Sequence, residues 1–242
     1  MRLAAFFGIV FGASLLAYLA IGLLGISQLA AFPFMVLSVA AAGICMTWLA
    51  EGRSGVRRLL ARIFRWRVPP VHYLAAAAPA VCILVTLLVL SLTVSSDFTP
   101  QLFWIGLVFG VVAGFFEEIG WSGFAYPRLA KRAGALWGAV VLGVLWALWH
   151  LPIVDSLGAA SPHGRALPLF FLAFGLVLVA LRILISWNYE KTGSLLLAQL
   201  THASSTGFLV VLGPPRVSAP QEAAWYAVYA LVLGAVALAF RP

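Results

Sequence analysis

Two adjacent acids and two histidines are the residues of this sequence best suited to chemistry. Glu117 and Glu118 follow fifteen residues that carry no charge. His150 ends the apolar run LWALWH, and His202 lies in QLTHASST. A charged side chain in the middle of an apolar membrane helix costs about 3 kcal/mol, so its presence there calls for a functional reason. Carboxylates and imidazoles transfer protons in catalysis, and these four residues are therefore candidates for an acid–base site.

The spacing of Glu117 and His150 predicts that they meet. Both are equally far along the chain from a turn near residues 132–134, RAG. If a helical hairpin folds at that turn, each arm is about 24 Å long at 1.5 Å per residue. Glu117 and His150 then lie at the same depth on adjacent helices. This requires the first helix to continue past Glu118 towards Arg132, with Pro127 as a kink.

A stripe of small residues leads to the second acid. Gly106, Gly110 and Gly114 recur every four residues, the pattern that lets two membrane helices approach closely. Continuing the stripe by four residues reaches Glu118 and then Ser122. Glu118 is therefore predicted beside a helix–helix contact, with Glu117 about 100° around the same helix.

The composition determines the class of protein that must position these residues. Of 242 residues, 64% are hydrophobic and 9% are charged, against about 25% charged in an ordinary soluble domain. This excludes a soluble domain, a disordered chain and a small disulfide-rich scaffold. We expect a single all-α domain over residues 1–242, a bundle of about eight transmembrane helices. The predicted spans are residues 3–24, 29–50, 71–95, 101–119, 134–154, 167–186, 193–213 and 222–240.

The net charge of +8 is interpreted as a topology signal rather than as a nucleic-acid site. With the N-terminus inside and eight alternating spans, only Arg165 and Arg216 fall outside. Thirteen basic residues fall inside or at the inner edge: Arg2, Arg53, Arg57, Arg58, Arg62, Arg65, Arg67, Arg128, Lys131, Arg132, Arg182, Lys191 and Arg241. We therefore predict that the protein lies in a bacterial inner membrane and that both of its termini are in the cytoplasm.

The arginine-rich stretch 53–67 has two compatible interpretations. Its arginines alternate with apolar residues at helical spacing, which is typical of a helix lying on an anionic leaflet. It also serves as a loop that sets topology.

The motifs, taken in order, resemble the CPBP (CAAX prenyl protease and bacteriocin-processing, or Abi) family, which includes the type II CAAX prenyl endopeptidases. The resemblance covers about residues 110–206, and the catalytic core is expected at about 101–213. The motifs read Glu117-Glu118-Ile-Gly-Trp-Ser122, Trp146-Ala-Leu-Trp-His150 and His202-Ala-Ser-Ser-Thr206.

The resemblance implies hydrolysis of a peptide bond within the membrane, in a peptide or protein substrate that can be lipidated. Glu117 would be the general base on a water, assisted by His150. His202 and Thr206 would stabilise the oxyanion, and Glu118 would orient the site. No cofactor is required on this interpretation.

Two positions depart from the family pattern. Ser122 replaces the usual arginine after the paired acids, and Thr206 replaces the usual asparagine. The first departure predicts that the acids lack a charge partner. The second shortens the reach of a hydrogen-bond donor.

Three alternatives remain open at the level of the sequence. Glu117, His150 and His202 could be three ligands of a catalytic zinc ion. Ser122 lies in Gly-Trp-Ser-Gly, which resembles the nucleophile motif of rhomboid proteases. A non-catalytic immunity, scaffold or transport protein would use the same polar residues without hydrolysis.

Overall fold

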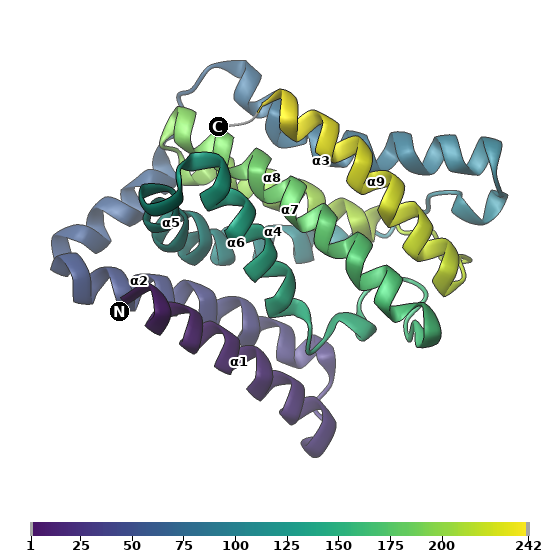
Figure 1. Ribbon diagram of the computed structural model, residues 1–242, viewed down its shortest axis with the longest axis horizontal. Helices are drawn as coiled ribbons and strands as arrows, with labels where there is room; N and C mark the ends of the chain where they lie inside the picture. Colours follow the sequence, from purple (N-terminus) through teal and green to yellow (C-terminus); the bar gives the residue numbers. More distant parts are fainter. Residues whose placement is uncertain (1, 241–242) are drawn as a thin grey trace.

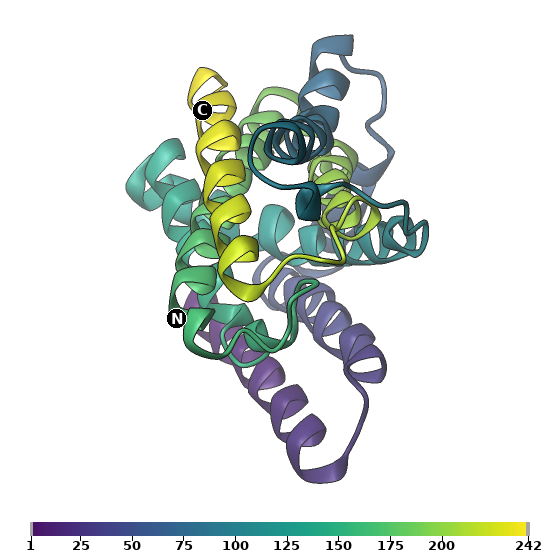
Figure 2. The same cartoon turned by 90° about the vertical axis from the view of Figure 1, so that its right-hand side faces the viewer.

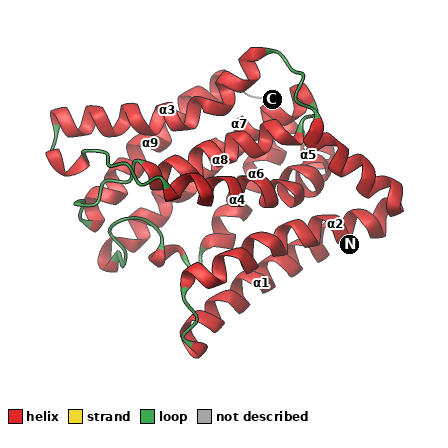
Figure 3. Cartoon of the chain, turned by 180° about the vertical axis from the view of Figure 1, so that it is seen from behind, coloured by secondary structure: helices red, strands yellow, loops and turns green. Residues whose placement is uncertain are grey.

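The computed structural model describes residues 2–240, and within that range every regular element is a helix (Figures 1 and 3). The prediction of an all-α bundle is confirmed. Arg241, one of the residues predicted at the inner edge, lies outside the described range. The α-helices are α1 (Arg2–Leu24), α2 (Gln28–Ala61), α3 (Pro70–Thr93), α4 (Ile105–Gly120), α5 (Tyr126–Ala133), α6 (Ala135–His150), α7 (Leu167–Thr192), α8 (Leu195–Val211) and α9 (Ala219–Ala239).

Each of the eight predicted spans coincides with a helical segment. Six segments are long and apolar enough to cross a membrane, and α6 and α8 are apolar but shorter. The second span is predicted to end at residue 50, close to a break in α2, and beyond this break the helix continues to Ala61. It does so through a bend at Gly52, whose φ of 66° is a conformation that glycine adopts at no steric cost.

The predicted hairpin is confirmed, and its first arm contains a feature that the spacing did not reveal. α4 runs into a π-helical turn, Trp121–Ala125, and then into α5. The π turn ends at Ala125, and Pro127 is the second residue of α5. The missing N–H of this proline therefore falls at the start of α5 rather than inside a regular helix. Gly134, with φ of 82°, ends α5 and starts α6. Such π turns occur mostly at functional sites.

The glycine stripe of α4 packs against the backbone of α8. A Cβ atom on Gly110 would lie 2.5 Å from the carbonyl oxygen of Ala203, and one on Gly114 would lie 2.6 Å from that of Gln199. The predicted close helix contact is thus present, with α8 as the partner. Around this pair, α2 packs on α4, α3 on α8, and α9 runs alongside α7 (Figures 1 and 2).

We predict that Gly110→Ala destabilises the protein, because the new methyl group collides with backbone that cannot rotate away. A loss of about 1–3 kcal/mol is expected for overpacking of this kind. Gly12→Ala in α1 is the matched control, since a Cβ atom there meets nothing within 4 Å. Thermal unfolding in detergent measures both variants. Equal melting temperatures for the two would contradict the close contact between α4 and α8.

Candidate active site

Glu117 is held by two tryptophans. Its Oε2 accepts hydrogen bonds from Trp121 Nε1 at 3.0 Å and from Trp146 Nε1 at 3.1 Å. Trp121 begins the π turn one helical turn after Glu117, whereas Trp146 comes from α6. The Oε1 atom accepts no hydrogen bond from any other residue in the range 2–240. One carboxylate oxygen is therefore fixed and the other remains available to a ligand.

Glu118 has the opposite environment, because both of its oxygens are occupied. Arg182 of α7 donates from Nη1 to Oε2 at 2.8 Å and from Nη2 to Oε1 at 2.9 Å. His202 lies 2.8 Å from Oε1, and Ser122 donates its hydroxyl to Oε2. Glu118, Arg182 and Ser122 are fully buried. A carboxylate with four donors is a structural anchor rather than a group ready to take a proton.

The prediction that the acids lack a charge partner is wrong. Arg182 supplies the charge from α7, sixty-four positions along the chain from Glu118. The Arg182 side chain is buried in the bundle rather than exposed at its surface. A short motif reports only neighbours on one helix, so it could not locate this partner. The available signal was a lone arginine in the apolar run VALRILIS.

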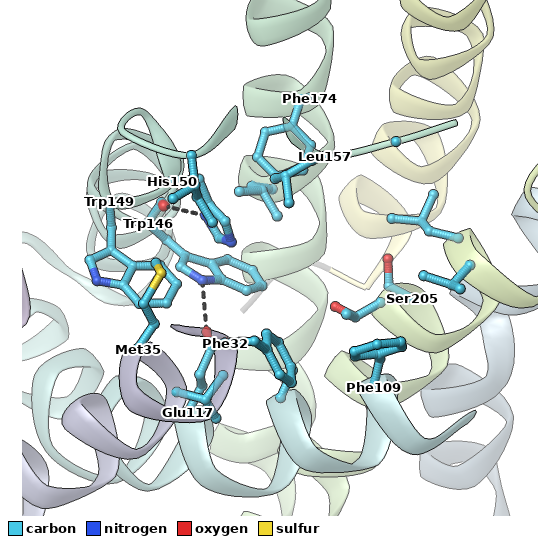
Figure 4. A pocket seen from close by; sticks show the side chains of 18 of the residues that line it. Phe32, Met35, Phe109, Glu117, Trp146, Trp149, His150, Leu157, Phe174 and Ser205 are labelled. Carbon is cyan, nitrogen blue, oxygen red and sulfur yellow. Dashed lines mark hydrogen bonds between the residues drawn. The ribbon is translucent and has the colours of Figure 1, made fainter. Parts of the chain in front are cut away.

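Hydrogen bonding fixes the orientation of both histidine rings. His150 Nδ1 lies 2.9 Å from the backbone oxygen of Trp146, and His202 Nδ1 lies 2.8 Å from Glu118 Oε1 (Figure 4 for His150). A carbonyl or carboxylate oxygen only accepts, so each Nδ1 carries a hydrogen. Each Nε2 is then the atom free for a ligand, which is the usual arrangement of functional histidines.

The predicted residues meet at a cavity of about 420 Å³ (Figure 4). Its wall includes Glu117, His150, His202 and Thr206. Most other lining residues are apolar, including Phe32, Met35, Phe109, Phe174 and Leu181. With Trp146, which also lines the cavity, five of the predicted site residues are thus brought together. Glu118 and Ser122 are absent from this wall, as far as the described residues show, and support it from behind.

A loop between α6 and α7 forms part of the cavity wall through Ser156, Leu157 and Gly158. Glu222 at the start of α9 holds this loop. Its carboxylate accepts the backbone N–H groups of residues 159 and 160 at 2.8 and 2.7 Å, and the His163 ring lies 3.2 Å away. The cavity therefore has a wall fixed by a buried carboxylate, which the sequence analysis missed.

The arrangement was tested against the zinc and serine alternatives. Within residues 2–240, no three His, Cys, Asp or Glu side chains gather closely enough to hold a metal ion. A zinc ion would have to bind Glu117 through Oε1, because Oε2 already accepts two indole N–H groups. Ser122 is buried and donates its hydroxyl to Glu118, which gives no support to its role as a nucleophile.

Comparison with known proteins agrees with this geometry. Residues 99–208 match the family model of the Rce1-like type II CAAX prenyl endopeptidases. This stretch is therefore similar to the Rce1-like family. The match contains every predicted site residue, and it confirms the resemblance found in the motifs. Together with the six long apolar helices, it supports an integral membrane protein whose central part is similar to a protease family.

A curated relative supports the same conclusion. The chain is 28% identical over 130 residues to a protein named CAAX prenyl protease 2 from Methanococcus maripaludis. The alignment covers 53% of this chain and 44% of the relative. The chain thus spans less than half the length of the curated relative that it matches.

We predict that Arg182→Met destabilises the protein by about 3–5 kcal/mol, because Glu118 would then be a buried carboxylate without its arginine partner. The double variant Glu118→Gln/Arg182→Met is expected to lose less than the sum of the two single variants, since both charges are removed together. Thermal unfolding in detergent measures this coupling. Arg165→Met, at an exposed loop arginine, is the control and should unfold like the unmodified protein. Additive losses in the double variant would argue against a coupled pair.

Proposed function

We propose that this protein is an intramembrane endopeptidase that hydrolyses a peptide bond in a membrane-associated or prenylated substrate. The observation that carries the proposal is Glu117, with one carboxylate oxygen fixed by two indoles and the other free beside an apolar cavity. His150 and His202 lie on the wall of the same cavity. A base and nearby donors around a water-excluding space suit the attack of water on a carbonyl carbon.

In the proposed reaction, the free oxygen of Glu117 takes a proton from a water molecule. The water oxygen bonds to the carbonyl carbon. This carbon becomes tetrahedral, and the former carbonyl oxygen becomes an oxyanion. The intermediate then collapses, the C–N bond breaks, and the proton held by Glu117 passes to the leaving amine. Trp121 and Trp146 keep the carboxylate in position throughout, so little of its freedom is lost during the reaction.

The histidines have different tasks in this scheme. His202 Nε2 donates to the oxyanion when the ring is protonated, and Glu118 stabilises that positive ring through Nδ1 at 2.8 Å. Thr206, one helical turn further along α8, supplies its hydroxyl as a second donor. His150 presents Nε2 to the cavity and assists Glu117 in orienting the water.

The substrate class follows from the cavity lining and from the relative. The wall is mostly apolar, with aromatic rings contributed by α2, α4 and α7. Such a wall favours an isoprenoid chain over a polar side chain. The name of the curated relative, CAAX prenyl protease 2, points the same way. We also propose that the protein lies in a bacterial inner membrane with its N- and C-termini in the cytoplasm, as the distribution of basic residues predicts.

We expect the purified protein in liposomes to cleave a quenched fluorescent prenylated CAAX peptide faster than the unprenylated peptide. Glu117→Gln and His150→Ala should each lower the cleavage rate by about 100-fold or more, the usual contribution of general acid–base catalysis. Glu51→Gln, at an exposed surface pair, is the matched control and should cleave normally. Full activity of Glu117→Gln would exclude the proposed base, and absence of cleavage of either peptide would exclude this substrate class.

The metal and serine alternatives have their own tests. Cleavage should be insensitive to a strong chelator, and Ser122→Ala should retain most of the activity. Loss of cleavage with chelator that zinc restores would make the same residues metal ligands. Loss of cleavage in Ser122→Ala, together with labelling of Ser122 by a fluorophosphonate, would instead support a serine nucleophile.

A further inference from the structure

The basic segment, defined here as residues 53–68, has a form that the proposed function does not use. It begins after the bend at Gly52, continues as the last turns of α2, and ends in a 3-10 turn and a short loop before α3. It contains six arginines and no acid. None of its residues lines the cavity of the candidate active site.

One face of the basic segment is fixed to the end of the bundle. Leu59 is 3% exposed and packs so closely on Gly123 of the π turn that a side chain there would collide with it. Arg62 donates from Nη1 to the Tyr189 hydroxyl at 2.6 Å, and the Ser194 hydroxyl donates to the backbone oxygen of Arg65 at 2.6 Å. The segment is therefore a docked element and not a loose loop.

The other face is exposed and combines positive charge with aromatic rings. Phe64 is 77% exposed and Trp66 is 57% exposed, and the Arg67 guanidinium lies 4.9 Å from the centre of the Trp66 ring. Arg65 and Arg67 make no ion pair with the described residues. Together with Phe64, Trp66, Val68 and Thr192, they line a surface hollow of about 530 Å³.

The neighbouring surface indicates what this face meets. Trp48 and Leu49, just before the bend, are 54% and 59% exposed, and Leu74 on α3 is 71% exposed. The basic segment thus lies where the exposed apolar belt of the bundle ends. Exposed tryptophan and arginine at the edge of an apolar belt are typical of the lipid headgroup region.

We propose that the hollow lined by Arg65, Trp66 and Arg67 is a binding site for the phosphate group of an anionic phospholipid. The two guanidinium groups bind the phosphate oxygens, and the rings of Phe64 and Trp66 lie among the upper acyl carbons. A soluble acidic protein would find charge complementarity here but would leave the exposed rings and the adjoining apolar belt uncovered. This binding site is independent of the proposed peptidase activity.

The test is a titration of the purified full-length protein in detergent with short-chain phosphatidylglycerol and with phosphatidylcholine. Native mass spectrometry counts the bound lipids and gives the dissociation constants. We expect tighter binding of phosphatidylglycerol, weakened by added salt. Arg65→Gln/Arg67→Gln should lower its affinity by about 25-fold, or roughly fivefold for each arginine near an anionic headgroup. Arg65→Lys/Arg67→Lys keeps the charge and should retain most of the binding.

The matched control is Arg165→Gln/Arg216→Gln, which removes two exposed arginines from other loops. Arg165 lies just before the start of α7, whereas the basic segment is hydrogen-bonded to Ser194, just beyond the end of that helix. Arg165 and the basic segment therefore lie at opposite ends of α7. This variant should bind phosphatidylglycerol like the unmodified protein. Equal binding of the two lipids, or an equal loss in the control variant, would overturn the proposal. Displacement of the lipid by a polyglutamate peptide or by free glycerol phosphate would also overturn it, in favour of a soluble partner.

Discussion

The buried ion pair between Glu118 and Arg182 is the interaction on which the candidate active site depends. It joins α4 to α7, and its carboxylate also fixes the ring of His202 on α8. The guanidinium carbon of Arg182 lies 4.4 Å from the centre of the Trp146 ring, whose N–H holds Glu117. A single pair of charges thus positions both the acid and the donor side of the cavity. Buried ions are costly, and two hydrogen bonds at 2.8 and 2.9 Å provide the geometry that offsets this cost.

Two acids that are neighbours in sequence acquire different properties because they point in different directions. Successive residues of a helix are about 100° apart, so Glu117 faces the cavity while Glu118 faces α7 and α8. The π turn that follows supplies a partner to each acid, Trp121 to Glu117 and Ser122 to Glu118. Local helix geometry is therefore sufficient to give two adjacent carboxylates different surroundings.

The sequence was sufficient to predict patterns along one helix and the pairing of helices around one turn. It was not sufficient to predict side-chain contacts with helices further along the chain. The glycine stripe, the hairpin and the pairing of Glu117 with His150 all follow from periodicity and from the position of a turn. The contacts of Arg182 with Glu118 and of Trp146 with Glu117 depend on how α6 and α7 pack, which no spacing encodes. The break of α2 at Gly52 lies close to the predicted end of the second span at residue 50, and a helix in the arginine-rich stretch after it was one of the two interpretations. The roles assigned to His202 and Thr206 come from the family resemblance and remain predictions.

The glycine stripe also limits the routes into the cavity. Along Gly106, Gly110 and Gly114 the backbones of α4 and α8 are in contact, so no lipid chain can pass between them unless the two helices separate. Near the other side of the cavity, α2 meets α4 through the rings of Phe32 and Phe109, whose centres are 5.4 Å apart. Side chains rotate far more easily than packed backbones move. Phe32 and Phe109 both line the cavity, so rotation of their rings would change the shape of its wall at the contact of α2 with α4 without any movement of the backbone.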